Sequence, residues 1–210
     1  SFFSTLFRGS PVTIDAFFDP GLLEGKRGII RQPQGLFEMI LLAKGVPADK
    51  VYAVLSTPSG LNQVLSALGD VRDFTTWYYT YADLEKAIRK GDIDQAFGLT
   101  SALSRASAAR DEDALQLVKG PIVYGLDYWA LSGNTENEET AYDFLKHAVS
   151  PEAGIAFAQE LAYLPTNTSS YIALNRLPNV PNSELVLVYD KNWWGSAAGK
   201  AVIKAFEAWL

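Results

Sequence analysis

Short runs of β-branched and aromatic residues alternate with helical stretches along this chain, and that alternation constrains its fold more than any other feature. Strands are expected at residues 2–7, 25–30, 71–79, 93–99 and 122–131. Helices are expected at residues 34–44, 60–68, 82–90, 136–148, 151–162 and 197–210. The helix at 34–44 carries its apolar residues at the helical period of 3.6. Strands that alternate with helices indicate an α/β architecture.

Composition excludes several classes of protein. The chain has 210 residues, 48% hydrophobic and 20% charged, which is typical of a globular protein of one or two domains. A net charge of −6 argues against a nucleic-acid partner, which would need a basic face. The chain contains no cysteine, which excludes disulfides, thiol nucleophiles and cysteine-ligated zinc. No apolar run approaches the roughly 18 residues of a membrane span, so we do not expect a membrane-embedded protein.

No motif in the sequence specifies a reaction. His147 is the single histidine and is expected in the middle of a helix. Neither of the phosphate-binding glycine motifs occurs. The acidic run at residues 111–113 lacks the ligand spacing of a metal site and is better interpreted as a solvated turn. We therefore expect a protein that is not an enzyme and that carries no metal or cofactor.

The run KGPIVYGLDYWALSG at residues 119–133 places a single carboxylate, that of Asp127, among aromatic and apolar strand formers. A buried carboxylate without a partner is costly, so Asp127 is paired, lies on the solvated side of an edge strand, or awaits a cation. Aromatic residues, among them Trp77, Tyr128 and Tyr163, also flank the expected strand ends and turns. Core packing is the first explanation for most of these rings. The alternative is a cleft in which aromatic faces and Asp127 surround a ligand ammonium group.

Several stretches resemble one family, in the family's own order and over nearly the whole chain. They are IDAFFDPGLLEGKRGI, LLAKGVPADKVY, IRKGDIDQAFGL, GLDYWALSGNTENEETAYDFLKHAVSPEAGIAFAQELAYLPTN and DKNWWG. In these stretches the chain resembles bacterial solute-binding proteins of ABC importers, in the spermidine/putrescine-type group. The resemblance implies a type II periplasmic-binding-protein-like fold, with two lobes that close on a small amine-bearing solute.

The resemblance also implies roles for individual residues. Asp127 matches the acidic position that receives a ligand amine, and Tyr163 matches a cleft aromatic before the Pro-Thr-Asn turn. Gln34 lies near a helix start where some members place a glutamate, and Thr100 falls where many have Trp-Asn-Gly. These departures leave an amino acid or a shorter amine open as the solute. The candidate solute-binding residues are Asp127, Tyr163, Trp77, Tyr128, Thr100 and Gln34.

Family members have an N-terminal lobe before their first hinge strand, and FFSTLF resembles that strand. We therefore expect a chain that lacks this lobe, with residues 2–7 beside the strand at 122–131 and their apolar side chains partly uncovered. The expected divisions are the second lobe with the hinge strand at 1–126, a crossing strand and helix pair at 127–162, and a C-terminal segment at 163–210 that packs on the second lobe.

The function implied is that of the periplasmic recognition component of an importer, with a small-molecule solute and an inner-membrane permease as partners. Two rival functions stay open. An enzyme that reuses the fold would show turnover or a perturbed acid–base pair in its cleft. A scaffold module built on such a lobe would show no ligand-dependent change in stability.

Overall fold

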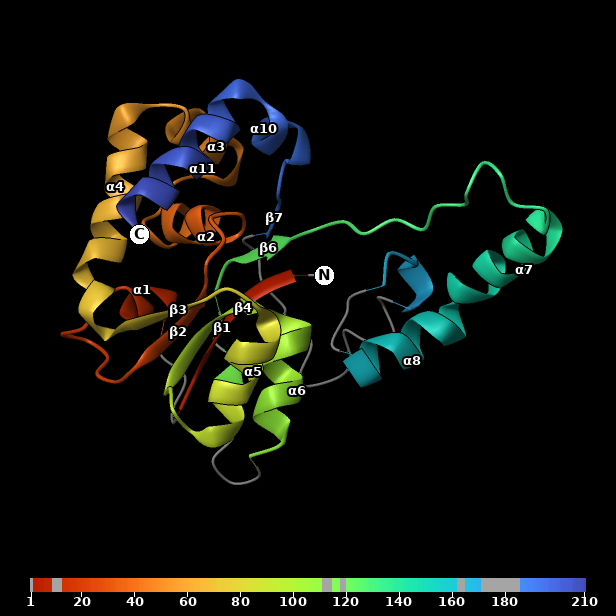
Figure 1. The fold of residues 1–210 in the computed structure, drawn as a ribbon, viewed down its shortest axis with the longest axis horizontal. Helices are drawn as coiled ribbons and strands as arrows, with labels where there is room; N and C mark the ends of the chain where they lie inside the picture. The colour runs from red at the N-terminus through yellow and green to blue at the C-terminus, as the bar shows by residue number, and fades with distance from the viewer. Residues whose placement is uncertain (1, 9–12, 111–114, 118–119, 162–164, 171–185) are drawn as a thin grey trace.

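In the computed structural model of the chain, the residues described are 2–8, 13–110, 115–117, 120–161, 165–170 and 186–210. A mixed β-sheet forms the centre, with the strand order β3-β2-β4-β1-β6-β7, and β5 pairs with β1 (Figure 1). The strands are β1 (Phe2–Phe7), β2 (Arg27–Ile30), β3 (Thr75–Tyr78), β4 (Gln95–Leu99), β5 (Gln116–Leu117), β6 (Ile122–Tyr124) and β7 (Val186–Val188).

Strand directions bring most strand ends to one side of the sheet. Strands β3 and β4 run parallel to β2, and β7 runs parallel to β6. Strand β1 lies antiparallel to both β4 and β6. The carboxyl ends of β2, β3, β4, β6 and β7 therefore meet at one edge, together with the start of β1. We call this the carboxyl edge and define it by the residues that follow these strands: Arg31, Tyr79, Thr100, Gly125 and Tyr189.

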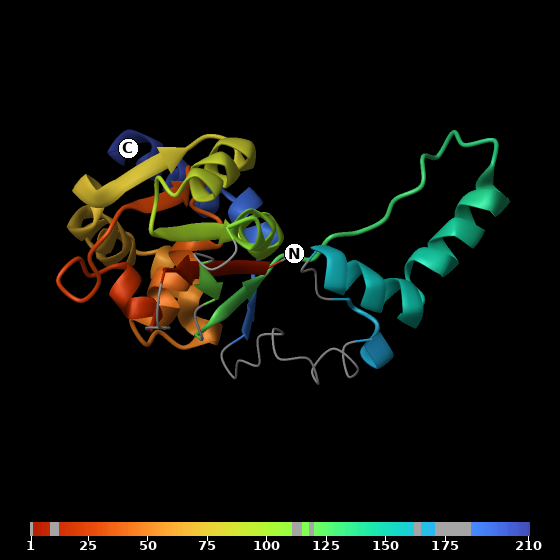
Figure 2. The same cartoon turned by 90° about the horizontal axis from the view of Figure 1, so that it is seen from below.

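Helices cover both faces of the sheet. The helices whose bounds are described, on the sheet and elsewhere, are α1 (Ile14–Phe17), α2 (Leu36–Ala43), α3 (Val51–Leu55), α4 (Pro58–Asp70), α5 (Tyr81–Lys90), α6 (Thr100–Ala108), α7 (Glu138–Ala148), α8 (Pro151–Leu161), α10 (Lys191–Gly195) and α11 (Ala197–Trp209), with short 3₁₀ turns at Ala48–Lys50 and Arg72–Phe74. Helices α2, α4 and α11 share one apolar core with the first face of the sheet. Helices α5 and α6 form a second core on the opposite face (Figures 1 and 2).

Several helix ends carry the polar groups that the backbone needs. The side chain of Thr57 accepts the N–H of Gly60 at the start of α4, and the side chain of Thr80 accepts the N–H of Asp83 in α5. Helix α5 ends at Gly91, whose φ of 73° is in the left-handed region that glycine adopts without strain. The expected helices at 60–68 and 82–90 are confirmed as α4 and α5, and these local signals explain where they begin and end.

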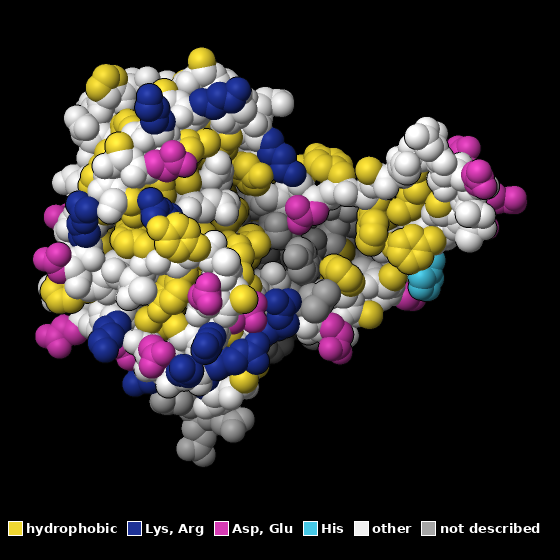
Figure 3. Space-filling model, viewed as in Figure 1, with side chains coloured by type: hydrophobic (Ala, Val, Ile, Leu, Met, Phe, Trp, Pro, Cys, Tyr) yellow, Lys and Arg dark blue, Asp and Glu magenta, His cyan; other side chains and the backbone are white. Residues whose placement is uncertain are grey.

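Residues 125–161 form an arm that leaves the sheet and carries α7 and α8 away from it (Figures 1 and 2). Hydrophobic side chains gather on the surface of this arm (Figure 3). Trp129 and Phe144 pack edge to face with their ring centroids 5.5 Å apart, yet 58% and 54% of their surfaces are exposed. Tyr142 and Phe157 are also about half exposed. The arm therefore presents an extended apolar surface.

The prediction of a strand over residues 122–131 is wrong for most of that range. Regular pairing covers only Ile122–Tyr124, and the chain then has no regular secondary structure as far as Ser132, with residues 126–130 exposed. Strand β1 pairs with β6 only through Phe2 and Phe3, so the residues after Tyr124 have no ladder partner on that side. A run of strand-forming residues becomes a strand only where a neighbouring strand supplies hydrogen bonds.

Strand β1 lies beside β6, as expected, but the three apolar side chains whose burial is described on it are not uncovered. Phe3, Leu6 and Phe7 are each at most 4% exposed. Because β1 lies between β4 and β6 in the sheet, the helices on both faces cover it. The expectation of partly uncovered side chains on this strand is therefore wrong.

Candidate functional site

The carboxyl edge is where this fold type places ligands. In open α/β sheets, ligands bind in the crevice outside the carboxyl ends of the strands. Segments from distant parts of the sequence meet there in this chain, because strands β2, β4, β6 and β7 all end at that side.

A compact group of polar and aromatic residues lies where β6 and β7 end. We call it the β6–β7 cluster and define it as Asp127, Tyr128, Tyr189 and Lys191. The Lys191 ammonium lies 5.4 Å from the ring centroid of Tyr128 and 6.0 Å from that of Tyr189, and it donates a hydrogen bond to the carbonyl of Leu126. The cluster thus already shows how an ammonium group sits against tyrosine faces at this edge.

Electrostatics connects Asp127 to the same cluster. Burial raises the pKa of Tyr189 most, and the nearby negative charges of Asp127 and Glu38 raise the pKa of that phenol further. Asp127 itself is exposed. An exposed carboxylate near the Tyr189 phenol can neutralise a cation that enters from solvent.

A second contact between a cation and a tyrosine ring lies at the β2–β3 end of the carboxyl edge. The guanidinium of Arg31 lies 4.8 Å from the ring centroid of Tyr79 and donates a hydrogen bond to its hydroxyl. Arg31 is half-buried, whereas 77% of Tyr79 is exposed. Gln34 follows on the same side, directly before Gly35, the N-cap residue of α2, and is also half-buried.

The buried ring of Phe3, on β1, lies between the β2–β3 end and the β6–β7 end of the carboxyl edge. Its ring stacks on Phe97 at a centroid distance of 6.1 Å and meets Tyr189 edge to face at 6.4 Å. Gly35 lies against it with φ of +80°, and a Cβ at that position would be 2.4 Å from the Phe3 ring. Only glycine satisfies both the backbone angle and the space, so this close approach requires Gly35.

The structure brings together some of the residues predicted from sequence and not others. Asp127 and Tyr128 belong to the β6–β7 cluster. Gln34 lies at the carboxyl edge, as does Thr100, which is 2% exposed as the first residue of α6. Tyr163 lies outside the described residues.

Trp77 has a different setting. It lies on β3, at the far end of the strand order from β6. Its ring packs edge to face on Phe206 at 5.6 Å and on Trp209 at 5.8 Å. The ring contacts described for Trp77 are thus with aromatic side chains of α11, and its place among the solute-binding residues stays a prediction.

Sequence reasoning missed Arg31, Tyr189 and Lys191. The last two follow the apolar run LVLV at residues 185–188, part of which forms β7. An apolar run that ends in Tyr-Asp-Lys is the pattern of a buried strand with polar residues at its carboxyl end, and that signal could have identified them.

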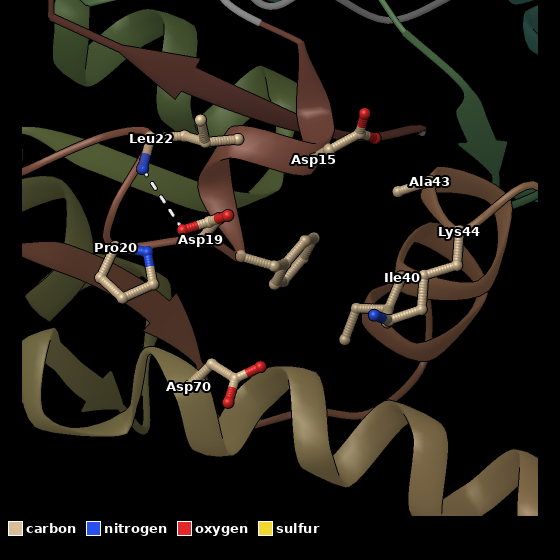
Figure 4. Close-up of a pocket in the computed structure, with 9 residues that line it drawn as sticks. Asp15, Asp19, Pro20, Leu22, Ile40, Ala43, Lys44 and Asp70 are labelled. Carbon is tan, nitrogen blue, oxygen red and sulfur yellow. Dashed lines mark hydrogen bonds between the residues drawn. The ribbon is translucent and has the colours of Figure 1, made fainter.

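A pocket of about 480 Å³ lies at the opposite edge of the sheet (Figure 4). It is lined by Asp15, Phe18, Asp19, Pro20, Leu22, Ile40, Ala43, Lys44 and Asp70. Helices α2 and α4 both end there, so this pocket is separated from the carboxyl edge by the length of the helices. The carboxylate of Asp19 accepts the backbone N–H groups of Gly21 and Leu22 and is occupied by its own turn.

Within the described ranges, no helix combines the length and the apolar character that crossing a membrane requires. No group of three or more histidine, aspartate or glutamate side chains in those ranges is arranged to hold a metal ion.

Comparison with known proteins places the chain in a family. Residues 4–182 match the family described as bacterial extracellular solute-binding protein. The gamma-aminobutyric acid-binding protein of Pseudomonas aeruginosa is 26% identical over 212 residues, which cover 98% of this chain and 59% of that protein. The chain therefore spans about three fifths of the length of this curated relative.

Solved structures agree on the fold. The binding protein MotA of A. tumefaciens B6, in complex with glucopine, has a TM-score of 0.76 at 23% identity, covering 100% of this chain and 69% of that chain. The spermidine/putrescine-binding protein PotD of Streptococcus pneumoniae has a TM-score of 0.63 at 12% identity, covering 99% and 67%. The expected α/β periplasmic-binding-protein-like fold is confirmed. With a family match over most of its length, the chain belongs to the bacterial extracellular solute-binding protein family.

Proposed function

We propose that this chain is the solute-binding component of an ABC importer, or a part of it, and that it captures a small amine-bearing solute outside the cytoplasm for an inner-membrane permease. The observation that carries this proposal is the β6–β7 cluster, where an exposed carboxylate and two tyrosine rings lie at the carboxyl edge of the sheet. The mechanism is capture without chemistry, in which lobes close on the solute about a hinge.

In this proposal the carboxylate of Asp127 receives the ammonium group of the solute, and the rings of Tyr128 and Tyr189 face its carbon chain. Gln34 provides a polar contact from the turn before α2, and Thr100 provides one from the start of α6. Tyr163 joins them on the strength of the family resemblance alone. Residues on these different segments would contact one solute because their strands end at the same edge.

The charges at the carboxyl edge favour an amino acid over a polyamine as the solute. Arg31 and Lys191 place two cations at the same edge as Asp127. A diamine would meet like charge there, whereas the carboxylate of an amino acid would find a cationic partner. The relation to a gamma-aminobutyric acid-binding protein at 26% identity supports the same choice. The spermidine/putrescine-type assignment has only the more distant PotD likeness in its support.

The experiment is calorimetric titration of the full-length protein with 4-aminobutyrate and with putrescine, beside a melting curve of each variant. The Asp127→Asn change should weaken binding of 4-aminobutyrate by about 2–5 kcal/mol, roughly thirty-fold to several thousand-fold, because one partner of a desolvated charge pair is removed. The melting temperature should stay close to that of the wild type, since Asp127 is exposed.

The matched control is Asp70→Asn, which removes a carboxylate from the pocket at the opposite edge. It should leave the affinity unchanged. An unaltered affinity in Asp127→Asn would contradict the assigned role. If the wild-type protein binds neither probe, the proposed solute class is wrong.

A further inference from the structure

We propose that Glu38 and Tyr52 are positioning residues of the solute site, which fix the backbone of Asp190 and thereby hold Tyr189 and Lys191 at the carboxyl edge. This inference rests on the proposed function and names residues that act on the site without touching the solute.

Glu38 lies in α2 and is fully buried, with 0% of its surface exposed. Both of its carboxylate oxygens accept hydrogen bonds. Oε2 accepts the backbone N–H of Gly35 at 2.9 Å, and Oε1 accepts the Tyr52 hydroxyl at 2.9 Å and the indole N–H of Trp194 at 2.6 Å. One carboxylate therefore joins the start of α2 to α3 and to α10, which lies more than 150 residues later in the sequence.

Tyr52 carries this connection to the carboxyl edge. While its hydroxyl donates to Glu38, it accepts the backbone N–H of Asp190 at 2.5 Å. The side chain of Asp190 in turn accepts the N–H groups of Asn192 and Trp193 at the start of α10. The backbone and the side chain of Asp190 are thus both held, and Asp190 lies directly between Tyr189 and Lys191.

A purely structural role does not account for this arrangement well. A buried carboxylate loses its hydration, and apolar side chains of similar volume would stabilise such a core at least as well. What a fully bonded polar network provides in addition is one defined geometry. The negative charge of Glu38 also acts on the Tyr189 phenol, the same ring on which Asp127 acts. The network also adjoins the β6–β7 cluster in the chain, because Asp190, whose N–H Tyr52 accepts, lies between Tyr189 and Lys191.

The test compares Tyr52→Phe with Ser56→Ala in the full-length protein. The first variant removes the hydroxyl that joins Glu38 to Asp190 but keeps the ring that packs on Trp193 at 5.0 Å. The control removes the hydroxyl of Ser56, which accepts the Trp193 indole N–H at 3.1 Å in the same contact without touching Glu38. Amide hydrogen exchange over residues 186–195 and affinity for 4-aminobutyrate are measured for both.

In Tyr52→Phe we expect exchange at Asp190 to become about fivefold faster and the affinity to fall by a similar factor, the usual effect of losing one hydrogen bond. Ser56→Ala should change neither quantity. If Tyr52→Phe lowers global stability but leaves exchange at 186–195 unchanged relative to the rest of the chain, or leaves the affinity unchanged, the positioning role is overturned. A wild-type protein that binds no probe would overturn the proposed function instead, and local exchange without ligand would then decide whether Glu38 and Tyr52 hold this segment.

Discussion

Arg27 should be among the residues most sensitive to substitution, because a buried guanidinium there holds a whole loop against the sheet. The side chain is 0% exposed. Its Nε donates to the carbonyl of Phe17 at 2.7 Å, and its two terminal nitrogens donate to the carbonyls of Leu23 at 2.7 Å and Gly25 at 2.9 Å. Burial lowers the pKa of Arg27, and the charge of Asp19 opposes that shift. Three carbonyls between α1 and β2 thus depend on one side chain.

The Arg27→Met change keeps most of the volume but removes every donor. A buried carbonyl left without a partner costs about 1–3 kcal/mol, and water can reach two of these three because their hydrogen bonds are only partly buried. The substitution also removes the desolvation cost of the buried charge, which offsets part of this loss of stability. We expect a net destabilisation of about 3 kcal/mol, which lowers the melting temperature of a chain of this size by roughly 6–12 °C.

The measurement is urea unfolding followed by tryptophan fluorescence, beside a thermal melt. Lys26→Met is the matched control, since Lys26 is the exposed neighbour with the same charge and should stay within about 0.5 kcal/mol of the wild type. A loss below about 1 kcal/mol for Arg27→Met, with an unchanged urea slope, would refute the view that these three hydrogen bonds hold the loop.

Two further predictions concern Glu38 and Trp77. Burial raises the pKa of Glu38, so the folded protein holds its proton more tightly than the unfolded chain does. The protonated Glu38 therefore adds to the free energy of unfolding in full below the unfolded pKa of about 4.3, and this addition is lost as the pH rises through the folded pKa. Its size is about 1.4 kcal/mol for each pH unit by which the folded pKa exceeds the unfolded one. Unfolding free energies across pH should therefore fall more steeply in the wild type than in Glu38→Gln; parallel curves would contradict this. Trp77→Ala should cost about 3 kcal/mol of stability through lost contacts with Phe206 and Trp209, at the low end for a tryptophan because the ring is only partly buried, while the affinity for 4-aminobutyrate stays at the wild-type value. A weaker affinity in a fully folded Trp77→Ala protein would return this ring to the solute site.

Local patterns in the sequence determined the fold class and most of the elements. The alternation of strand and helix signals predicted an α/β chain, and the strands at 2–7 and 93–99 are confirmed as β1 and, in its core, β4. Threonine caps, Pro58 at a helix start and Gly91 at a helix end act within a few residues of themselves. Such signals are legible without knowledge of the rest of the molecule, because the groups they satisfy are close in sequence.

The site depended on contacts that no local pattern reports. Asp127 was predicted from its unusual surroundings, but its neighbours Tyr189 and Lys191 lie more than 60 residues later and reach it only because β7 pairs beside β6. Trp77 shows the converse, since an aromatic residue on a strand is equally compatible with a core and with a cleft. A sequence determines which side chains are apolar, aromatic or charged, and at what local period they recur. Only the tertiary structure decides which strand lies beside which, and therefore which of those side chains share an edge.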